Sequence, residues 1–146
     1  MSHISTVELH VTDLNCLESA CLELGLEFVR DVTSYRWFGI FVGDAPLPHG
    51  FSKSELGKCE HVIRIPGDGT AYEVGVVSRR DGKPGYTLLW DSWQGGYGLQ
   101  AHVGENCGKL SQTYATHVAT NQARRQGYSV RREVLANGKV QLTCSR

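Results

Sequence analysis

The chain has 146 residues, of which 40% are hydrophobic and 21% are charged, a composition ordinary for a single globular domain over residues 1–146. Its 15 acidic and 15 basic residues cancel, so a general nucleic-acid binder is disfavoured because no long-range attraction to phosphate is expected. No apolar run approaches the roughly 20 residues that span a bilayer, and no signal peptide is recognisable, so we expect no membrane association.

The first part of the chain predicts a strand, a helix and two further strands. The alternation of apolar and polar residues in Ile4–Val11 favours a strand. Asp13 is a suitable N-cap for a helix over Leu14–Leu24, where apolar residues recur at helical spacing. Further strands are expected over Leu26–Arg30 and Tyr35–Val42.

The middle of the chain predicts an antiparallel meander. Prolines and glycines make residues 43–58 an irregular loop before it. Strands are expected over His61–Ile65, Ala71–Val77 and Tyr86–Trp93, because turns rich in Pro and Gly separate these apolar runs. The glycines between Gln94 and Gly108 then predict a mobile or ligand-contacting loop.

The last part of the chain predicts a long helix and a hairpin. Lys109–Gln126 is the longest run without Gly or Pro, its apolar residues recur four apart, and Gly127 is a suitable stop. Asn137-Gly138 is a strong hairpin signal between Tyr128–Leu135 and Lys139–Cys144.

These elements predict an α+β fold. Two helices would cover one face of an antiparallel sheet, giving a two-layer sandwich with a ferredoxin-like or related topology. Strands from both ends of the chain are expected to lie together in this sheet, and its other face is expected to be open.

Motifs near both ends of the chain are typical of one known family. They are Lys109–His117, Gly127–Val130 and Asn137–Leu142, with Met1–Glu8 and Leu14–Gly25 at the start. In these motifs the chain resembles the hypothetical chloroplast reading frame 35 family. Its members are small proteins of unknown function from algal plastids, cyanobacteria, other bacteria and phages.

The resemblance implies a fold and a class but no catalytic residues. The chain departs from the family between Asp44 and Lys58, which reads as an insertion, and between Gly95 and Gly108, which is rich in glycine. Genes for similar proteins often neighbour one for an AAA-type ATPase, which implies a protein partner. The implied location is cytoplasmic: a bacterial cytosol, a plastid stroma or an infected host cell.

A metal site is the most specific chemical hypothesis. Cys59 and His61 form a Cys-x-His pair and His102 and Cys107 a His-x4-Cys pair, which together could bind zinc in a tetrahedral site. The spacing matches no common zinc motif, so buried thiols and hydrogen-bonded imidazoles are the favoured interpretation. The five cysteines, an odd number without a regular framework, suit free thiols in a reducing compartment.

A thiol nucleophile is a related hypothesis. Cys107 is the best candidate because it precedes the long helix and has His102 nearby in sequence. No third catalytic member is recognisable, so a structural role is favoured.

Two residues of the long helix are candidates for ligand binding. Tyr114 and His117 lie one turn apart and could hold a ligand between them. The favoured alternative places Tyr114 in the core, because aromatic side chains at helical spacing are usually packed.

Two groups of residues are candidates for partner binding. Trp93 and Tyr97 are aromatic residues beside glycines, and such residues dominate binding hot spots. Arg124, Arg125 and Arg131 form a basic cluster that could contact RNA or an acidic protein surface. The interleaved Glu133 and the zero net charge favour a solvated face instead.

The function predicted from the sequence is that of a small non-enzymatic binding or regulatory protein that acts through a protein partner and needs no cofactor. The partner would be an AAA-type ATPase or, for a phage-borne copy, a host protein. A metal- or thiol-dependent enzyme that uses Cys59, His61, His102 and Cys107 is the alternative, and an RNA-binding module is a second. A homodimer could close an uncovered sheet edge.

Overall fold

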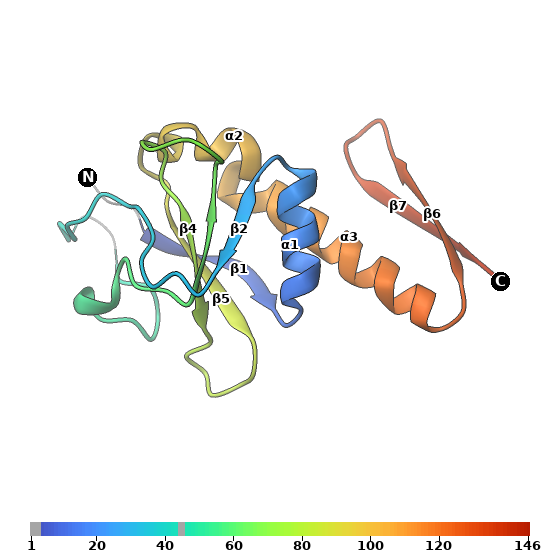
Figure 1. The fold of residues 1–146 in the computed structure, drawn as a ribbon, viewed down its shortest axis with the longest axis horizontal. Coiled ribbons are helices and arrows are strands. Elements are labelled where there is room, and N and C mark those ends of the chain that lie inside the picture. The colour runs from blue at the N-terminus through green and yellow to red at the C-terminus, as the bar shows by residue number, and fades with distance from the viewer. Residues whose placement is uncertain (1–3, 44–45) are drawn as a thin grey trace.

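The computed structural model describes residues 4–43 and 46–146. Its main sheet has five strands in the order β1-β5-β4-β3-β2, and all neighbouring strands are antiparallel (Figure 1). The strands are β1 (Ile4–Val11), β2 (Glu27–Arg30), β3 (His61–Arg64), β4 (Val74–Ser78) and β5 (Tyr86–Asp91). The meander predicted for the middle of the chain is confirmed, and β1 joins it along β5.

Two helices, α1 (Leu14–Glu23) and α3 (Gly108–Arg125), cover one face of the sheet. Leu17 of α1 and Leu110 of α3 are fully buried in one apolar cluster with strand residues such as Ile63. The predicted α+β sandwich with two helices on one face is confirmed. Its topology is related to the ferredoxin-like one but differs in element order, since four meander strands follow α1 where a βαββαβ fold has two.

The other face of the sheet is covered by irregular chain, so the prediction of an open face is wrong. Tyr35 and Phe51 pack there with Val62 and Leu89 in a second apolar cluster. The ring of Tyr35 lies over Gly75 of β4, where an added Cβ would come within 2.4 Å of the ring. A side chain at this strand position would therefore displace the covering segment.

The strand predicted over Tyr35–Val42 does not form. The backbone amide of Tyr35 donates to the carbonyl of Gly57 at 2.9 Å, and that of Arg36 donates to the Glu73 carboxylate at 2.7 Å. An isolated bridge joins Ser34 to Lys58 in place of a ladder. The segment is therefore apolar because it packs on the second face of the sheet, and it does not pair as a strand.

Short helical segments lie within both stretches that were predicted to be irregular. The first contains the 3-10 turn η1 (Lys53–Glu55), and its residues 44 and 45 lie outside the described residues. The second contains η2 (Trp93–Gly98), α2 (Leu99–Val103) and η3 (Glu105–Cys107). Leu99, Val103 and Cys107 are fully buried, so this glycine-rich stretch is part of the core and its prediction as a loop is wrong.

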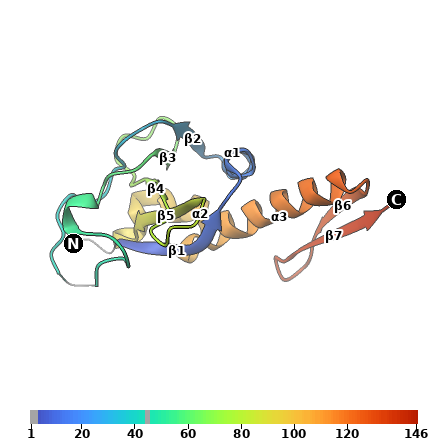
Figure 2. The same ribbon diagram turned by 90° about the horizontal axis from the view of Figure 1, so that it is seen from below.

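The C-terminal half of α3 extends beyond the sheet and leads to the hairpin of β6 (Ser129–Val134) and β7 (Val140–Ser145) (Figure 2). Gly138, with φ of 82°, closes the turn between these strands. The hairpin was predicted correctly. It forms a separate two-stranded sheet, however, so the expectation that both chain ends share one sheet is wrong. Among the helices that the structure describes, none is long and apolar enough to cross a membrane.

Candidate functional site

Asp91, at the end of β5, holds two distant segments of the chain together. Its side chain is fully buried, and Oδ2 accepts a hydrogen bond from the backbone amide of Phe38 at 3.1 Å. Its Oδ1 accepts one from the backbone amide of Trp93 at 3.0 Å. Because one carboxylate binds both amides, Phe38 and Trp93 emerge from the fold beside each other.

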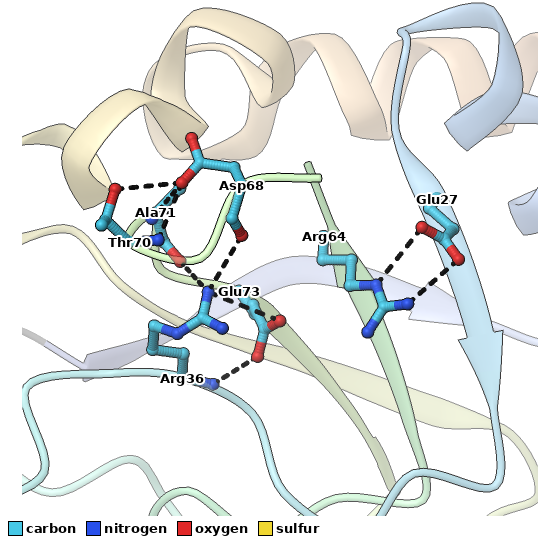
Figure 3. Close-up of polar contacts among 7 residues, drawn as sticks. All are labelled: Glu27, Arg36, Arg64, Asp68, Thr70, Ala71 and Glu73. Carbon is cyan, nitrogen blue, oxygen red and sulfur yellow. Dashed lines mark hydrogen bonds and ion pairs between the residues drawn. The ribbon is translucent and has the colours of Figure 1, made fainter. Parts of the chain in front are cut away.

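A second buried carboxylate fixes the same segment slightly earlier in the chain. Glu73 accepts the hydrogen bond from the amide of Arg36, and its own amide donates to the Arg36 carbonyl at 3.0 Å. The guanidinium of Arg36 donates to the carbonyl of Ala71 at 2.6 Å and lies 3.8 Å from Glu73 (Figure 3). Asp68 accepts from the amides of Thr70 and Ala71, which fixes the turn that Arg36 contacts.

A shallow cavity of about 270 Å³ lies beside this network and is lined by Arg36 and Arg64. Figure 3 shows Arg64 turned toward Glu27 on the neighbouring strand, to which it donates at 3.1 and 3.3 Å. Asp68 and Glu73 line the same cavity and offset the two arginines. The charges of the lining therefore give no preference for an anion, and these contacts serve to anchor the chain.

Tyr97 lies next to this junction. The amide of Tyr72 donates to the carbonyl of Gly96 at 2.9 Å, and the rings of Tyr72 and Tyr97 meet edge to face at 5.1 Å. Tyr97 is nevertheless 50% exposed and has φ of 53°, a left-handed conformation that costs an L-residue roughly 1–2 kcal/mol. The backbone is thus held so that this ring faces solvent.

We use the name aromatic surface for two groups that Asp91 joins at Phe38 and Trp93: the exposed Phe38, Ile40 and Val42, and the half-buried Trp93 with the exposed Tyr97. Ile40 is 63% exposed and Val42 is 47% exposed, and both continue the segment that Asp91 anchors at Phe38. Exposed apolar side chains that lie together are typical of protein-interaction sites.

The predicted partner-binding residues fall at opposite ends of the molecule. Trp93 and Tyr97 belong to the aromatic surface. Arg124 and Arg125 lie in the last turn of α3, and Arg131 lies on β6, where it pairs with Glu133 at 3.1 Å (Figure 1). The structure therefore does not unite the aromatic and basic groups into one site.

The comparison with known families covers the part of the chain from near the start of the irregular loop to the hairpin. Residues 46–143 match the family described as "Protein of unknown function (DUF1257)". The chain belongs to this family. No curated protein matches the chain. No solved structure matches it either.

The DUF1257 match includes Trp93 and Tyr97 but begins after Phe38, Ile40 and Val42. Sequence reasoning missed these three because their apolar run was predicted to form a strand. The signal that could have found them is Asp91, a carboxylate at the end of a mostly apolar strand, which needs hydrogen-bond donors when it is buried.

The two predicted ligand-binding residues of this DUF1257 chain have separate roles. The Tyr114 hydroxyl oxygen accepts hydrogen bonds from the amides of Thr12 and Asp13 at 3.0 and 3.2 Å, and the residue is buried. The Nε2 atom of His117 lies 3.1 Å from the carboxylate of Glu23. Tyr114 thus ties α3 to the start of α1, in agreement with the core interpretation, and His117 faces a different contact.

The four predicted metal ligands are not brought together. The thiol of Cys59 donates to the carbonyl of Val32, and Nδ1 of His61 accepts from the amide of Asp31 at 3.0 Å. His102 lies against the end of α1, and Cys107 is in the core between the sheet and the helices. The described residues contain no group of three or more His, Cys, Asp or Glu side chains that could hold a metal ion.

The environment of the buried cysteines disfavours a nucleophilic thiolate. Burial raises the pKa values of the Cys21, Cys59 and Cys107 thiols to about 12. A reactive thiol needs a lowered pKa, which a nearby cation or a helix start would provide. Cys107 precedes α3, but its complete burial outweighs that position.

Proposed function

We propose that this chain is a non-enzymatic protein that acts by binding a partner protein at the aromatic surface. The observation that carries the proposal is the double use of Asp91, whose buried carboxylate fixes both Phe38 and Trp93. A buried carboxyl group is costly unless its oxygens are hydrogen-bonded. Because Asp91 binds the amides of Phe38 and Trp93, the backbone that carries these two side chains is fixed before a partner binds.

The rigidity of this surface favours tight binding. Association is opposed by the ordering of loops and side chains, so a surface already fixed by Asp91 and Glu73 loses less entropy when it binds. Trp, Tyr and Phe side chains supply large contact areas and dominate binding hot spots. Gln94 and Tyr97, at φ of 52° and 53°, show the unfavourable backbone conformations that cluster at functional sites.

The likeness to the hypothetical chloroplast reading frame 35 family supports a narrower form of the proposal. In that form the partner is an AAA-type ATPase or, for a phage-borne copy, a host protein, and binding takes place in a cytosol, a plastid stroma or an infected cell. The free cysteines are compatible with a reducing compartment.

Site-specific crosslinking in the source cells tests the proposal. A photoreactive phenylalanine analogue is placed at Ile40, at Tyr97 or, as a control, at Leu22 of α1, which is 70% exposed. We expect Ile40 and Tyr97 to give the same discrete protein adduct and Leu22 to give none. Equal labelling from all three positions, or no adduct from Ile40 and Tyr97, would contradict the proposal.

A further inference from the structure

The last strand of the C-terminal hairpin, β7, has one edge that pairs with no strand among the described residues. Within the described chain, β7 pairs with β6 and with no other strand. The amide of Leu135 donates to the carbonyl of Lys139 at 2.8 Å, which makes this the first hydrogen-bonded pair of the hairpin. Because hydrogen-bonded and non-hydrogen-bonded pairs alternate, the backbone groups of Val140, Leu142 and Cys144 point away from β6.

The composition of β7 offers no protection against pairing along this edge. Its sequence, Val-Gln-Leu-Thr-Cys-Ser, contains no charged residue and no proline, the usual means by which edge strands avoid association. Its residues alternate strictly, with Val140, Leu142 and Cys144 on one face and Gln141 and Thr143 on the other. The edge is thus neutral, and the strand is apolar on one face.

We infer that β7 pairs with β7 of a second copy of this chain, forming a four-stranded antiparallel sheet across a two-fold axis at Leu142. In this register Val140 lies opposite Cys144 of the other copy, and Gln141 lies opposite Thr143. This register places Val140, Leu142 and Cys144 in hydrogen-bonded pairs with the other copy. These are the three residues whose backbone groups point away from β6. Apolar side chains therefore meet apolar ones, and polar side chains meet polar ones.

The chemistry of the strand favours a second copy over an unrelated strand. The apolar positions are symmetric about Leu142, so the strand is complementary to itself when it is reversed. The 15 acidic and 15 basic residues give the chain no net charge, so two copies do not repel one another at long range. A two-stranded sheet is marginally stable alone, and pairing would double its strands.

Sedimentation of the full chain, with paired variants, tests this dimer. Leu142→Lys places a charge on the apolar face at the axis, and Thr143→Lys places the same charge on the polar face of the same strand. We expect the wild type and Thr143→Lys to sediment as dimers. We expect Leu142→Lys to raise the dimer dissociation constant at least about tenfold.

Disulfide crosslinking tests the register without relying on a disruptive variant. Val140→Cys would face the native Cys144 of the other copy at about 5.5 Å between Cα atoms, within disulfide reach. Two Cys144 residues would be roughly 13 Å apart, at about 3.3 Å per residue over four residues, so the wild type should not crosslink. Gln141→Cys, on the opposite face, is the matched control.

Covalent dimers from Val140→Cys alone would support the register. A wild type that sediments as a monomer at every concentration would overturn the inference, and this is also the result expected if the edge pairs only with another protein. A Leu142→Lys variant that dimerises as tightly as the wild type would overturn it, as would equal crosslinking of Val140→Cys and Gln141→Cys. The aromatic surface lies elsewhere, so its function stands or falls separately.

Discussion

The carboxylate of Glu23 accepts two hydrogen bonds from the guanidinium of Arg132, at 2.7 and 2.6 Å. Glu23 is the last residue of α1 and Arg132 lies in the middle of β6, so this bidentate pair joins the main sandwich to the C-terminal hairpin. His117 of α3 meets the same carboxylate. One side chain thus sets the position of the hairpin relative to both helices.

Replacing Arg132 with Met should loosen the hairpin and leave the sandwich unchanged. The Arg132 and Glu23 side chains are about one-third exposed, at 35% and 34%, so solvent screening limits the contribution of the pair to about 1 kcal/mol. Amide hydrogen exchange in β6 and β7 should accelerate about fivefold, with exchange in β3 to β5 unaltered. Arg131→Met is the control, because Arg131 pairs within its own strand. Equal exchange in the two variants would refute this role.

Acid should loosen the same contact. The hydrogen bond from Arg132 is the main cause that holds the pKa of Glu23 below its ordinary value of 4.5. Since the folded-state pKa is depressed, the stabilisation is complete above pH 4.5 and is lost as the pH falls through the lower folded-state pKa. The rate of amide hydrogen exchange in β6 and β7, corrected for the intrinsic rate, should therefore rise as the pH falls through the folded-state pKa of Glu23. The variant Glu23→Gln should not show this rise at low pH. If the rise persists in Glu23→Gln, the titration of another group causes it.

Tyr114→Phe should destabilise the whole sandwich. The variant keeps the buried ring but leaves the amides of Thr12 and Asp13 without their acceptor, at a cost of about 1–2 kcal/mol in the free energy of unfolding. Urea denaturation measures this loss. Tyr128→Phe is the matched control, because Tyr128 is half-buried and its ring contacts Arg146, a contact that Phe retains. Two unfolding curves that coincide would mean that water replaces the hydroxyl.

Thiol labelling should distinguish one cysteine from the other four. Cys144 is exposed, whereas Cys16, Cys21, Cys59 and Cys107 are buried with raised pKa values. At about pH 8 a chromogenic thiol reagent should react quickly with one thiol, and all five should react in denaturant. Cys144→Ser should remove the fast reaction. A second fast thiol would revive the hypothesis of a cysteine nucleophile.

Local sequence patterns predicted the elements whose hydrogen bonds are local. The helix expected over Lys109–Gln126 is observed over Gly108–Arg125, and the hairpin around Asn137-Gly138 forms as expected. Helical spacing and turn residues determine these elements without reference to the rest of the chain. The strands β3 to β5 were predictable for the same reason, since short turns connect them.

The aromatic surface depends on long-range contacts that periodicity does not reveal. Tyr35–Val42 has the composition of a strand, yet its amides bond to Glu73 and Asp91, which lie 37 and 53 residues away from their partners Arg36 and Phe38. Sequence patterns therefore identified Trp93 and Tyr97 but not Phe38 and Ile40. The separation of the basic residues at the end of α3 from the aromatic pair was not predictable either, because the direction of α3 away from the sheet is also a tertiary property.

The affinity of this chain for the partner protein recovered by crosslinking tests the central claim most directly. Its affinity is measured by calorimetry for the wild type, for Ile40→Ser and for Leu22→Ser, which removes a similarly exposed apolar side chain from α1. We predict that Ile40→Ser weakens binding at least about tenfold, as expected for a hot-spot residue, and that Leu22→Ser binds like the wild type. An Ile40→Ser variant that binds as tightly as the wild type would contradict a partner-binding role for the aromatic surface.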